Sequence, residues 1–369
     1  MQQTLLPTPS RRLPAPIALG AQTDIRYFGS EVRGILNGPE TTGMGFWSIN
    51  PYVGCAFGCA YCYARYTHRH VSERAVQELG GADEASQALL ELPDWLSFER
   101  RIFVKRNAAA ALREQLASRG PRMARFLGGE TLLIGTATDP YQPAERRYRV
   151  TRSVLEVLGE YRGLRVVITT KSPLVIRDID LLARIAGRSR LTVHVSLICT
   201  DRTLSRRIEP RAPTPEARLR AIQRLSEAGI DVGVNVMPIL PGITDRPDIL
   251  RTLLRRVADA GVSHVHACAI RLQPAARRRY LPFLAAEFPE LVQQYRTTFA
   301  EDDHMNARYT SGLLRFMERS SREVGLPFHT LSDRQSEGST PAPEDERRCA
   351  DGVPIADAPA AQLELALVS

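Results

Sequence analysis

The chain has 369 residues, of which 43% are hydrophobic and 24% charged, and these proportions exclude a generally disordered protein. No run of about 18 apolar residues is present, which excludes a conventional membrane helix, and the first residues lack an apolar leader, so we expect a cytoplasmic protein. The net charge is +8, but residues 331–369 hold eight acidic side chains against three arginines. The rest of the chain therefore has a net charge of about +13, which would attract phosphate backbones and anionic metabolites alike. An arginine-rich surface that only faces solvent would give the same excess of positive charge.

The two ends of the chain differ in composition from the middle. Residues 1–25 contain four prolines and are predicted to form a loose arm, while residues 331–369 are predicted to form a disordered acidic tail. Between them we expect an α/β barrel domain over residues 26–275 and a C-terminal helical extension over residues 276–330.

Short runs rich in β-branched residues alternate with amphipathic segments of helical period along the middle of the chain. The predicted strands are residues 45–52, 131–135, 165–169, 191–197, 231–237 and 263–269. Two helices between them end in Ala-Gly, at Gly229 and Gly261, where glycine suits a left-handed cap. About six βα repeats imply a parallel sheet, open or curled into a barrel, with function at the carboxyl ends of its strands.

Three of the six cysteines lie in the stretch GCAFGCAYC directly after the first predicted strand. Cys55, Cys59 and Cys62 have the spacing C-x3-C-x2-C, and no second cysteine pair completes a familiar zinc site, although His68 and His70 follow. A C-x2-C redox motif would leave Cys55 unexplained. Three thiolates on one loop can instead hold three irons of a [4Fe–4S] cluster and leave the fourth iron open.

This motif, with Tyr61 just before the last cysteine, resembles the signature of the radical S-adenosylmethionine (SAM) superfamily. The longer stretch NPYVGCAFGCAYCYAR is similar to the spore photoproduct lyase-like branch, whose members are often labelled DNA repair photolyases. The resemblance implies a partial (βα)6 TIM-type barrel, a [4Fe–4S] cluster on the three cysteines, and SAM on the open iron. It also implies an electron donor such as a flavodoxin or ferredoxin and a 5′-deoxyadenosyl radical that abstracts hydrogen from a substrate.

The resemblance suggests SAM contacts at the strand ends. In the superfamily a GGE-like stretch ends the second strand, but Gly128 to Glu130 precede that strand here, so we predict an ordinary turn. Thr138 or Asp139, in the stretch GTATDPYQPAER, is the candidate for the amino group of SAM. A polar βα turn explains these residues as well.

Later strand ends supply further candidates. Lys171 follows the third strand and could bind a carboxylate or a phosphate, and Ser196 ends the fourth. Glu209 and Arg211 resemble the segment that holds the ribose and carboxylate of SAM in this branch, and Arg218 is an alternative partner for the carboxylate.

Asn235 in the fifth strand is the candidate contact for the adenine, although an ordinary inward-facing residue is nearly as good an interpretation. His194, His264 and His266 lie within strand patterns and are predicted to be core or mouth residues rather than ligands. The other three cysteines are given no role: Cys199 and Cys268 are predicted to be small buried residues, and Cys349 falls in the tail.

Three functions remain open. The first is repair of a DNA lesion by a carbon–carbon lyase of spore photoproduct lyase type, but the stretch in which that family has a hydrogen-donating cysteine reads Thr136-Ala137 here. Cys199 or Tyr141 could substitute. The second is a radical SAM enzyme that acts on a small molecule or a protein, and the third is a nonenzymatic iron–sulfur or nucleic-acid-binding protein. The oligomeric state is not predicted.

Overall fold

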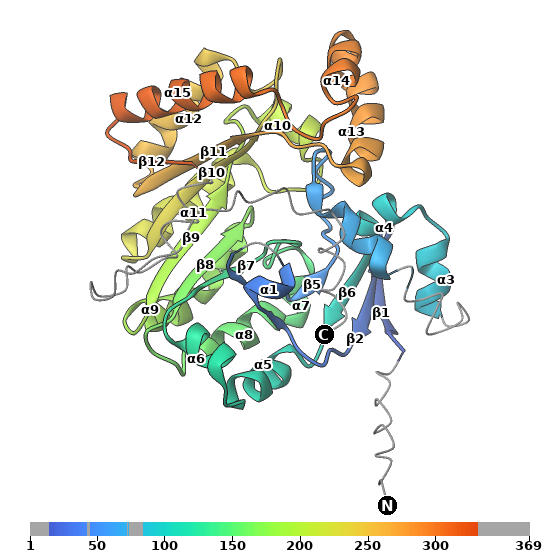
Figure 1. Ribbon diagram of the computed structural model, residues 1–369, viewed down its shortest axis with the longest axis vertical. Coiled ribbons are helices and arrows are strands. Elements are labelled where there is room, and N and C mark those ends of the chain that lie inside the picture. Colours follow the sequence, from blue (N-terminus) through green and yellow to red (C-terminus); the bar gives the residue numbers. More distant parts are fainter. Residues whose placement is uncertain (1–14, 43–44, 72, 74–83, 331–369) are drawn as a thin grey trace, which may run out of the picture.

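The computed structural model describes residues 15–42, 45–71, 73 and 84–330. Its main feature is an eight-stranded sheet in the order β12-β11-β10-β9-β8-β7-β4-β3 (Figure 1). The strands are β3 (Leu36–Asn37), β4 (Trp47–Ile49), β7 (Thr131–Ile134), β8 (Arg165–Thr170), β9 (Arg190–Ser196), β10 (Asp231–Ile239), β11 (His264–Ala269) and β12 (Phe328–His329). All neighbours from β4 to β12 pair in parallel, and β3 is antiparallel at one edge.

The six predicted strands are confirmed as β4, β7, β8, β9, β10 and β11, in chain order across the sheet. Such an order of parallel strands, with a helix after most of them, is the partial barrel that the sequence predicts. The helices of this repeat are α7 (Ala144–Tyr148), α8 (Val150–Leu158), α9 (Ile179–Ala186), α10 (Arg202–Ile208), α11 (Pro215–Glu227) and α12 (Pro247–Asp259). The three-residue-per-turn helix η2 (Pro173–Asp178) precedes α9.

The two faces of β9, β10 and β11 differ sharply. Valines at alternate positions are buried in one apolar cluster with α11, α12 and α15 (Ala307–Glu323), and the members on the strands are Val193, Val195, Val232, Val234 and Val265. Because side chains alternate along a strand, the intervening residues share the opposite, concave face. That face is polar and carries histidine, serine and asparagine.

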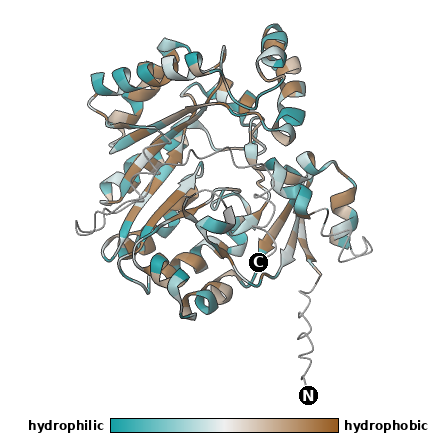
Figure 2. Cartoon of the chain, viewed as in Figure 1, coloured by the Kyte–Doolittle hydropathy of each residue, from teal (hydrophilic) through white to brown (hydrophobic). Residues whose placement is uncertain are grey.

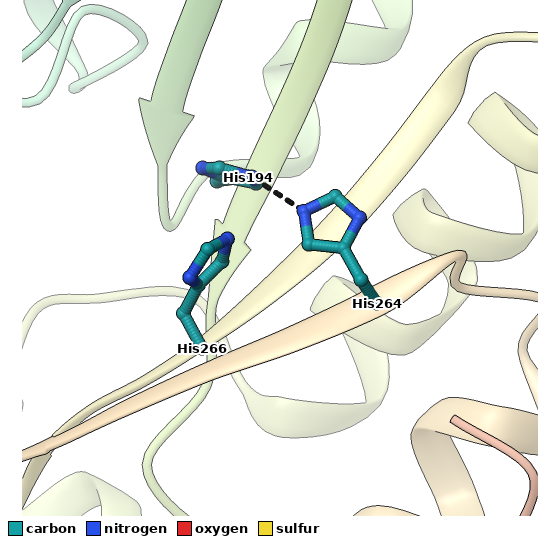
Figure 3. Close-up of side chains that lie close together, drawn as sticks. All are labelled: His194, His264 and His266. Atoms are coloured by element: carbon teal, nitrogen blue, oxygen red, sulfur yellow. Dashed lines mark hydrogen bonds between the residues drawn. The ribbon is translucent and has the colours of Figure 1, made fainter. Parts of the chain in front are cut away.

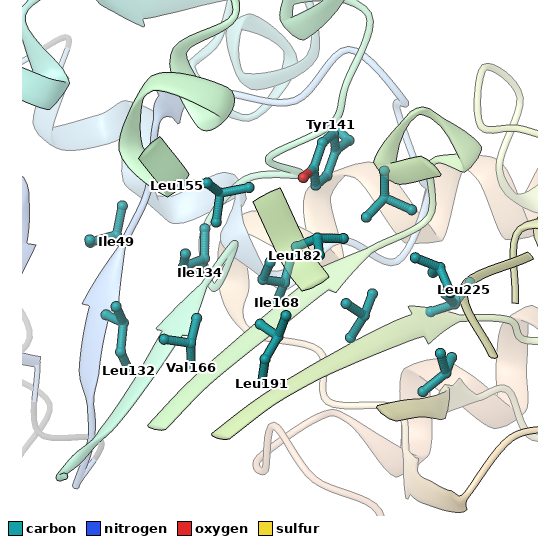
Figure 4. Close-up of a cluster of buried hydrophobic side chains, with 14 of the residues drawn as sticks. Ile49, Leu132, Ile134, Tyr141, Leu155, Val166, Ile168, Leu182, Leu191 and Leu225 are labelled. Carbon is teal, nitrogen blue, oxygen red and sulfur yellow. The ribbon is translucent and has the colours of Figure 1, made fainter. Parts of the chain in front are cut away.

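The apolar cluster continues beneath the other half of the sheet (Figure 4), where Ile134, Ile168 and Leu182 are completely buried. Figure 2 shows hydrophobic residues concentrated on the strands and on the helix sides that face them. None of the helices in the described ranges is long and apolar enough to cross a membrane.

A second sheet, in the order β1-β2-β6-β5, was not predicted. Its strands are β1 (Ile17–Gln22), β2 (Ile25–Ser30), β5 (Tyr52–Val53) and β6 (Arg101–Lys105), and the adjoining helices are α3 (Glu84–Leu90) and α4 (Asp94–Arg100). The predicted loose arm over residues 1–25 is therefore wrong for β1, which pairs with β2. Its side chains are almost all exposed, so no apolar alternation marked it as a strand. Residues 1–14 lie outside the described residues.

The remaining elements border these sheets. They are α1 (Pro39–Thr42), η1 (Tyr63–Tyr66), α5 (Ala108–Ala117), α6 (Pro121–Leu127), α13 (Pro274–Glu287), η3 (Pro289–Leu291) and α14 (Val292–Thr298). The predicted helical extension thus contains α13, α14 and α15, and it also contains β12, which adds to the main sheet. The predicted acidic tail, with Cys349, falls outside the part of the chain that the structure describes.

The predicted turns are confirmed. Gly129 has a positive φ of 98°, and Glu130 lies before β7, where its carboxylate accepts a 2.7 Å hydrogen bond from the Trp47 indole. Gly229 and Gly261 follow the ends of α11 and α12 with φ of 73° and 83°.

Candidate functional site

The three clustered cysteines lie on the loop between β5 and η1, which we call the cysteine loop (residues 54–62). Cys55 and Cys59 are buried, Cys62 is partly buried, and none forms a disulfide. The loop follows the short strands β4 and β5, so it lies at the carboxyl end of β4 in the parallel sheet. This is the end at which barrel enzymes place their active sites.

Two glycines let the cysteine loop pack closely against its neighbours. Gly54 and Gly58 have φ of 85° and 65°. A Cβ atom on Gly58 would lie 2.5 Å from Nη2 of Arg211, and one on Gly54 would lie 2.7 Å from the carbonyl oxygen of Phe98. A side chain at Gly54 would therefore push the loop away from the backbone of Phe98, and one at Gly58 would displace the Arg211 guanidinium and strain the backbone.

The loop after β7 fastens the cysteine loop on one side. Thr138 Oγ1 donates a 2.6 Å hydrogen bond to the carbonyl oxygen of Gly54. The side-chain amide of Gln142 makes two bonds to the loop: its Nε2 donates to the carbonyl oxygen of Gly54 at 3.0 Å, and its Oε1 accepts from the Ala56 amide at 2.9 Å. Thr138, a predicted SAM contact, is thus placed beside the cysteines and holds their backbone.

Asp139, the other candidate in that stretch, is buried and joins β7 to the end of β8. Its carboxylate accepts hydrogen bonds from Thr170 Oγ1 and from the amide of Lys171, both at 2.7 Å, and from the amide of Tyr141 at 2.9 Å. Burial raises the pKa of Asp139 in spite of these bonds. Its contact with SAM stays a prediction, but the structure gives it a clear positioning role.

Glu209 lies in a buried cluster with two cations. Its carboxylate accepts hydrogen bonds from the Tyr61 hydroxyl and from the Arg218 guanidinium, and Lys171 Nζ lies 4.0 Å away. Burial by itself would raise the pKa of Glu209, but Arg218 and Lys171 outweigh it, so the pKa is lowered. This cluster connects Tyr61 in the cysteine loop to the segments after β8 and α10.

Arg211 is bound to the cysteine loop from the other side. Its Nε donates a 2.6 Å hydrogen bond to the carbonyl oxygen of Ala56, and its backbone amide donates to Phe57 at 3.2 Å. Its Nη2 lies 3.5 Å from the carboxylate of Glu99. Its role as a partner of the SAM carboxylate stays a prediction, and the alternative partner, Arg218, is buried against Glu209.

The buried Glu99 and Arg65 were missed in the sequence. Glu99 pairs with Arg65, Arg211 and Arg279, and Arg65 also donates a 2.9 Å hydrogen bond to the carbonyl oxygen of Cys59. Three cations around one carboxylate leave an excess of positive charge beside the loop. Glu99 lies in α4, and the sequence around it does not distinguish it from an exposed glutamate on a helix.

The remaining candidates lie on the concave face of the sheet. Ser196 and Asn235 are buried and pair in register across β9 and β10, and His266 on β11 is the next residue in the same row. Ser196 and Asn235 thus lie at the same height in the sheet as the carboxyl end of β8. Lys171 is the first residue after that strand. Contacts of Ser196, Asn235 and Lys171 with SAM stay predictions.

The number of thiols on the loop bears on which metal it could hold. A structural zinc ion takes four protein ligands in a tetrahedron, and the loop offers three cysteines. In a cubane cluster each cysteine binds a different iron, so three thiolates can hold three irons and leave the fourth open.

The surroundings of the thiols also fit a cluster. Burial raises the pKa of Cys55 to about 12 and raises the pKa of Cys59 and Cys62 as well. Without a metal these groups are thiols, whereas a bound cluster supplies the positive charge that stabilises thiolates. Lys171, which favours the thiolate of Cys59, adds to that charge.

His68 predicts a pH dependence for the region around the loop. Burial lowers its pKa to about 4 from the ordinary 6.5, although its Nε2 lies 2.8 Å from the carbonyl oxygen of Arg101. Below pH 6.5 His68 is protonated in the unfolded chain but stays neutral in the folded chain until the pH approaches 4. The free energy of unfolding therefore keeps its full value above pH 6.5 and decreases as the pH falls towards 4, by up to about 3 kcal/mol.

Urea unfolding of the cluster-free protein at pH 7.5 and pH 5 measures this effect. We expect His68→Gln, which can still donate to Arg101, to lose less stability than the original chain over that interval. An equal loss in both proteins would contradict the assignment to His68.

Comparisons with known proteins agree with this geometry. The family model described as "Radical SAM superfamily" matches residues 49–254. The uncharacterized protein Rv2578c of Mycobacterium tuberculosis is 34% identical over 272 residues, which cover 73% of this chain and 72% of the relative. The uncharacterized protein ORF301 of Acidianus two-tailed virus is 28% identical over 222 residues, which cover 59% of this chain and 65% of the relative.

Among solved structures, spore photoproduct lyase complexed with dinucleoside spore photoproduct is similar with a TM-score of 0.56 and 16% identity. The match covers 83% of this chain and 81% of that one. At this identity the likeness shows a shared fold.

Proposed function

Because this chain belongs to the radical SAM superfamily, we propose that Cys55, Cys59 and Cys62 hold a [4Fe–4S] cluster that binds SAM at its open iron. The superfamily's cofactors are this cluster and SAM. The proposal rests mainly on one observation. The loop at the carboxyl end of the sheet is held in place by hydrogen bonds and carries three thiols, so a four-iron cluster on it would keep one iron open. When bound, the two cofactors supply a 5′-deoxyadenosyl radical that abstracts hydrogen from the substrate, with the electron coming from a flavodoxin- or ferredoxin-like donor.

The chain's own residues position the cluster and exclude water. Thr138 and Gln142 hold the first half of the loop, and Arg65 holds the carbonyl oxygen of Cys59. An apolar cluster encloses the thiols; its completely buried members are Ala60, Ile198, Cys199, Ile208, Leu240, Leu272, Ala276, Tyr280 and Leu284. A dry, rigid site of this kind protects a reactive radical from side reactions.

For the substrate, we propose a DNA lesion of the spore photoproduct type. The fold shared with spore photoproduct lyase over most of the chain and the basic charge of about +13 outside residues 331–369 support this. Cys199 is a candidate hydrogen donor, because it is buried in the same apolar cluster as Cys55 and Cys59. Burial raises its pKa to about 12, so it keeps the S–H bond that donation needs.

One observation favours a second candidate, a small molecule or a protein as substrate. The sequence has no cysteine between Cys62 and Cys199, and the stretch where the lyase-like family has its donor holds Thr136 and Ala137. Tyr141, the other possible substitute, is buried in the main apolar cluster, whereas Cys55, Cys59 and Cys199 belong to the smaller one.

The substrate is tested with the dinucleoside spore photoproduct, reconstituted protein, SAM and dithionite under anaerobic conditions. We expect release of the two repaired thymidines. Cys199→Ala should still cleave SAM but lose most repair, whereas Cys268→Ala, on β11, should behave like the original chain. The protein could instead cleave SAM without any repair and show no salt-dependent binding of duplex DNA. This result would rule out the lesion as the substrate and favour a small molecule or a protein.

A further inference from the structure

Three histidines meet on the concave face of the sheet. His194 on β9 and His264 on β11 both pair in register with Gly233 on the strand between them. His266, two residues further along β11, lies on the same face of that strand. His194 and His266 are buried and His264 is half-buried. The sequence predicted core or mouth residues, and it could not show that separate strands bring them together.

The imidazoles converge on one point (Figure 3). Ring centroids are 5.1 Å apart for His194 and His264, 4.9 Å for His194 and His266, and 5.0 Å for His264 and His266. One ring nitrogen from each lies within 4.8 Å of the other two, and the Nε2 atoms of His194 and His264 are 2.8 Å apart. This is the arrangement from which three imidazoles can bind one ion.

Gly233 provides the space for two of these rings. A Cβ atom at this position would lie 2.4 Å from Nε2 of His264 and 2.6 Å from Cδ2 of His194. Any other residue would therefore push the two imidazoles apart. The backbone of Gly233 is not in the left-handed region, so the need for glycine here is steric and comes from the histidines.

A hydrogen-bonded chain fixes the orientation of His264. Its Nδ1 lies 2.8 Å from the hydroxyl of Ser263, which lies 2.5 Å from the Asp231 carboxylate and 3.1 Å from the carbonyl oxygen of Val232. Both of those oxygens only accept, so the hydroxyl donates to one of them and accepts from Nδ1–H. The lone pair of His264 is then on Nε2, which faces the other two histidines. Metal-binding histidines are oriented by such chains.

We propose that His194, His264 and His266 bind a divalent first-row transition-metal ion, with zinc as the representative. Imidazole nitrogen suits zinc, nickel and copper and does not suit magnesium or calcium. The ion would join β9 to β11 across β10. His329 on β12 lies beside the cluster, with its ring centroid 5.6 Å from that of His264 and 5.4 Å from that of His266. The three histidines are not part of the cysteine loop, so this proposal does not depend on the proposed iron–sulfur site.

The binding test uses the full-length chain with Cys55, Cys59 and Cys62 replaced by alanine, so that added ions cannot bind the loop thiols. Equilibrium dialysis against Zn²⁺ should show one tightly bound ion per chain, and a large excess of Mg²⁺ should not displace it. Replacement by Co²⁺ should give visible absorption of a nitrogen-bound ion without thiolate charge-transfer bands.

Variants in the same background locate the ion. His194→Gln, His264→Gln and His266→Gln should each abolish tight binding, and Ser263→Ala should weaken it by about 10- to 100-fold, as expected for a residue that orients a ligand. His304→Gln, an exposed histidine outside the cluster whose Nδ1 lies 3.1 Å from Asp302, should bind zinc like the parent.

Thermal unfolding in EDTA checks that each variant folds as its parent does. Zinc should raise the melting temperature of the parent and of His304→Gln, and should not raise that of the three ligand variants. The proposal is overturned if the parent binds no zinc, or if the ligand variants fold and bind zinc as tightly as the parent.

Discussion

Cys59→Ala is expected to abolish both assembly of the iron–sulfur cluster and formation of 5′-deoxyadenosine. Cys59 is the middle thiol of the loop, it is buried, and its carbonyl oxygen is held by Arg65. Alanine removes one of the three proposed iron ligands and leaves no other cysteine on the loop to replace it. Iron and sulfide content after anaerobic reconstitution, followed by assay of 5′-deoxyadenosine with dithionite and SAM, measures both effects.

The matched control is Cys268→Ala, because Cys268 lies on β11 outside the loop and is half-buried. Cys268 was predicted to be a small buried residue, and the structure shows it only half-buried. The control should load iron and cleave SAM as the original chain does. A Cys59→Ala protein that retains a four-iron cluster and full SAM cleavage would show that the loop is not the site.

Glu209→Ala is expected to cause the largest loss of stability among single substitutions near the site. Arg218 is fully buried and Lys171 is 17% exposed, so removal of the carboxylate leaves two cations without their shared partner. Loss of one member of such a buried pair costs about 3–5 kcal/mol. Tyr61 also loses the acceptor of its hydroxyl, and with it a contact of the cysteine loop.

Urea unfolding of the cluster-free protein measures this loss. Glu287→Ala is the control, because Glu287 pairs with Arg207 at 2.6 Å while both side chains are nearly 40% exposed. An exposed pair contributes about 1 kcal/mol or less. Glu209→Gln, which can still accept from Tyr61, should fall between the two. If Glu209→Ala and Glu287→Ala lost equal amounts of unfolding free energy, Glu209 would not be part of a buried charged cluster that stabilises the cysteine loop.

The sequence predicted the main sheet well because its strands are buried β-branched runs between amphipathic helices. It failed for β1, whose side chains are exposed, and for β6, in which all five residues are buried although two of them are basic. Lys105 shows how unusual this is: burial lowers its pKa to about 8. Neither pattern resembles the alternation on which strand prediction depends.

The cysteine motif could be recognised because its spacing is local. The supports of the loop could not, because they are tertiary contacts between distant segments. Thr138, Asp139 and Arg211 were predicted at the correct end of the sheet, but the structure shows each of them bonded to backbone or side-chain groups of the protein. The register that brings His194 beside His264 is likewise set by strand pairing and not by either residue's neighbours.

The most direct test of the central claim is SAM cleavage by the original chain. The protein is reconstituted anaerobically with iron and sulfide, reduced with dithionite and mixed with SAM, and 5′-deoxyadenosine is quantified against unreduced protein. We predict a four-iron cluster and reductant-dependent formation of 5′-deoxyadenosine. A chain that loads the four-iron cluster and forms none would contradict the proposed radical function.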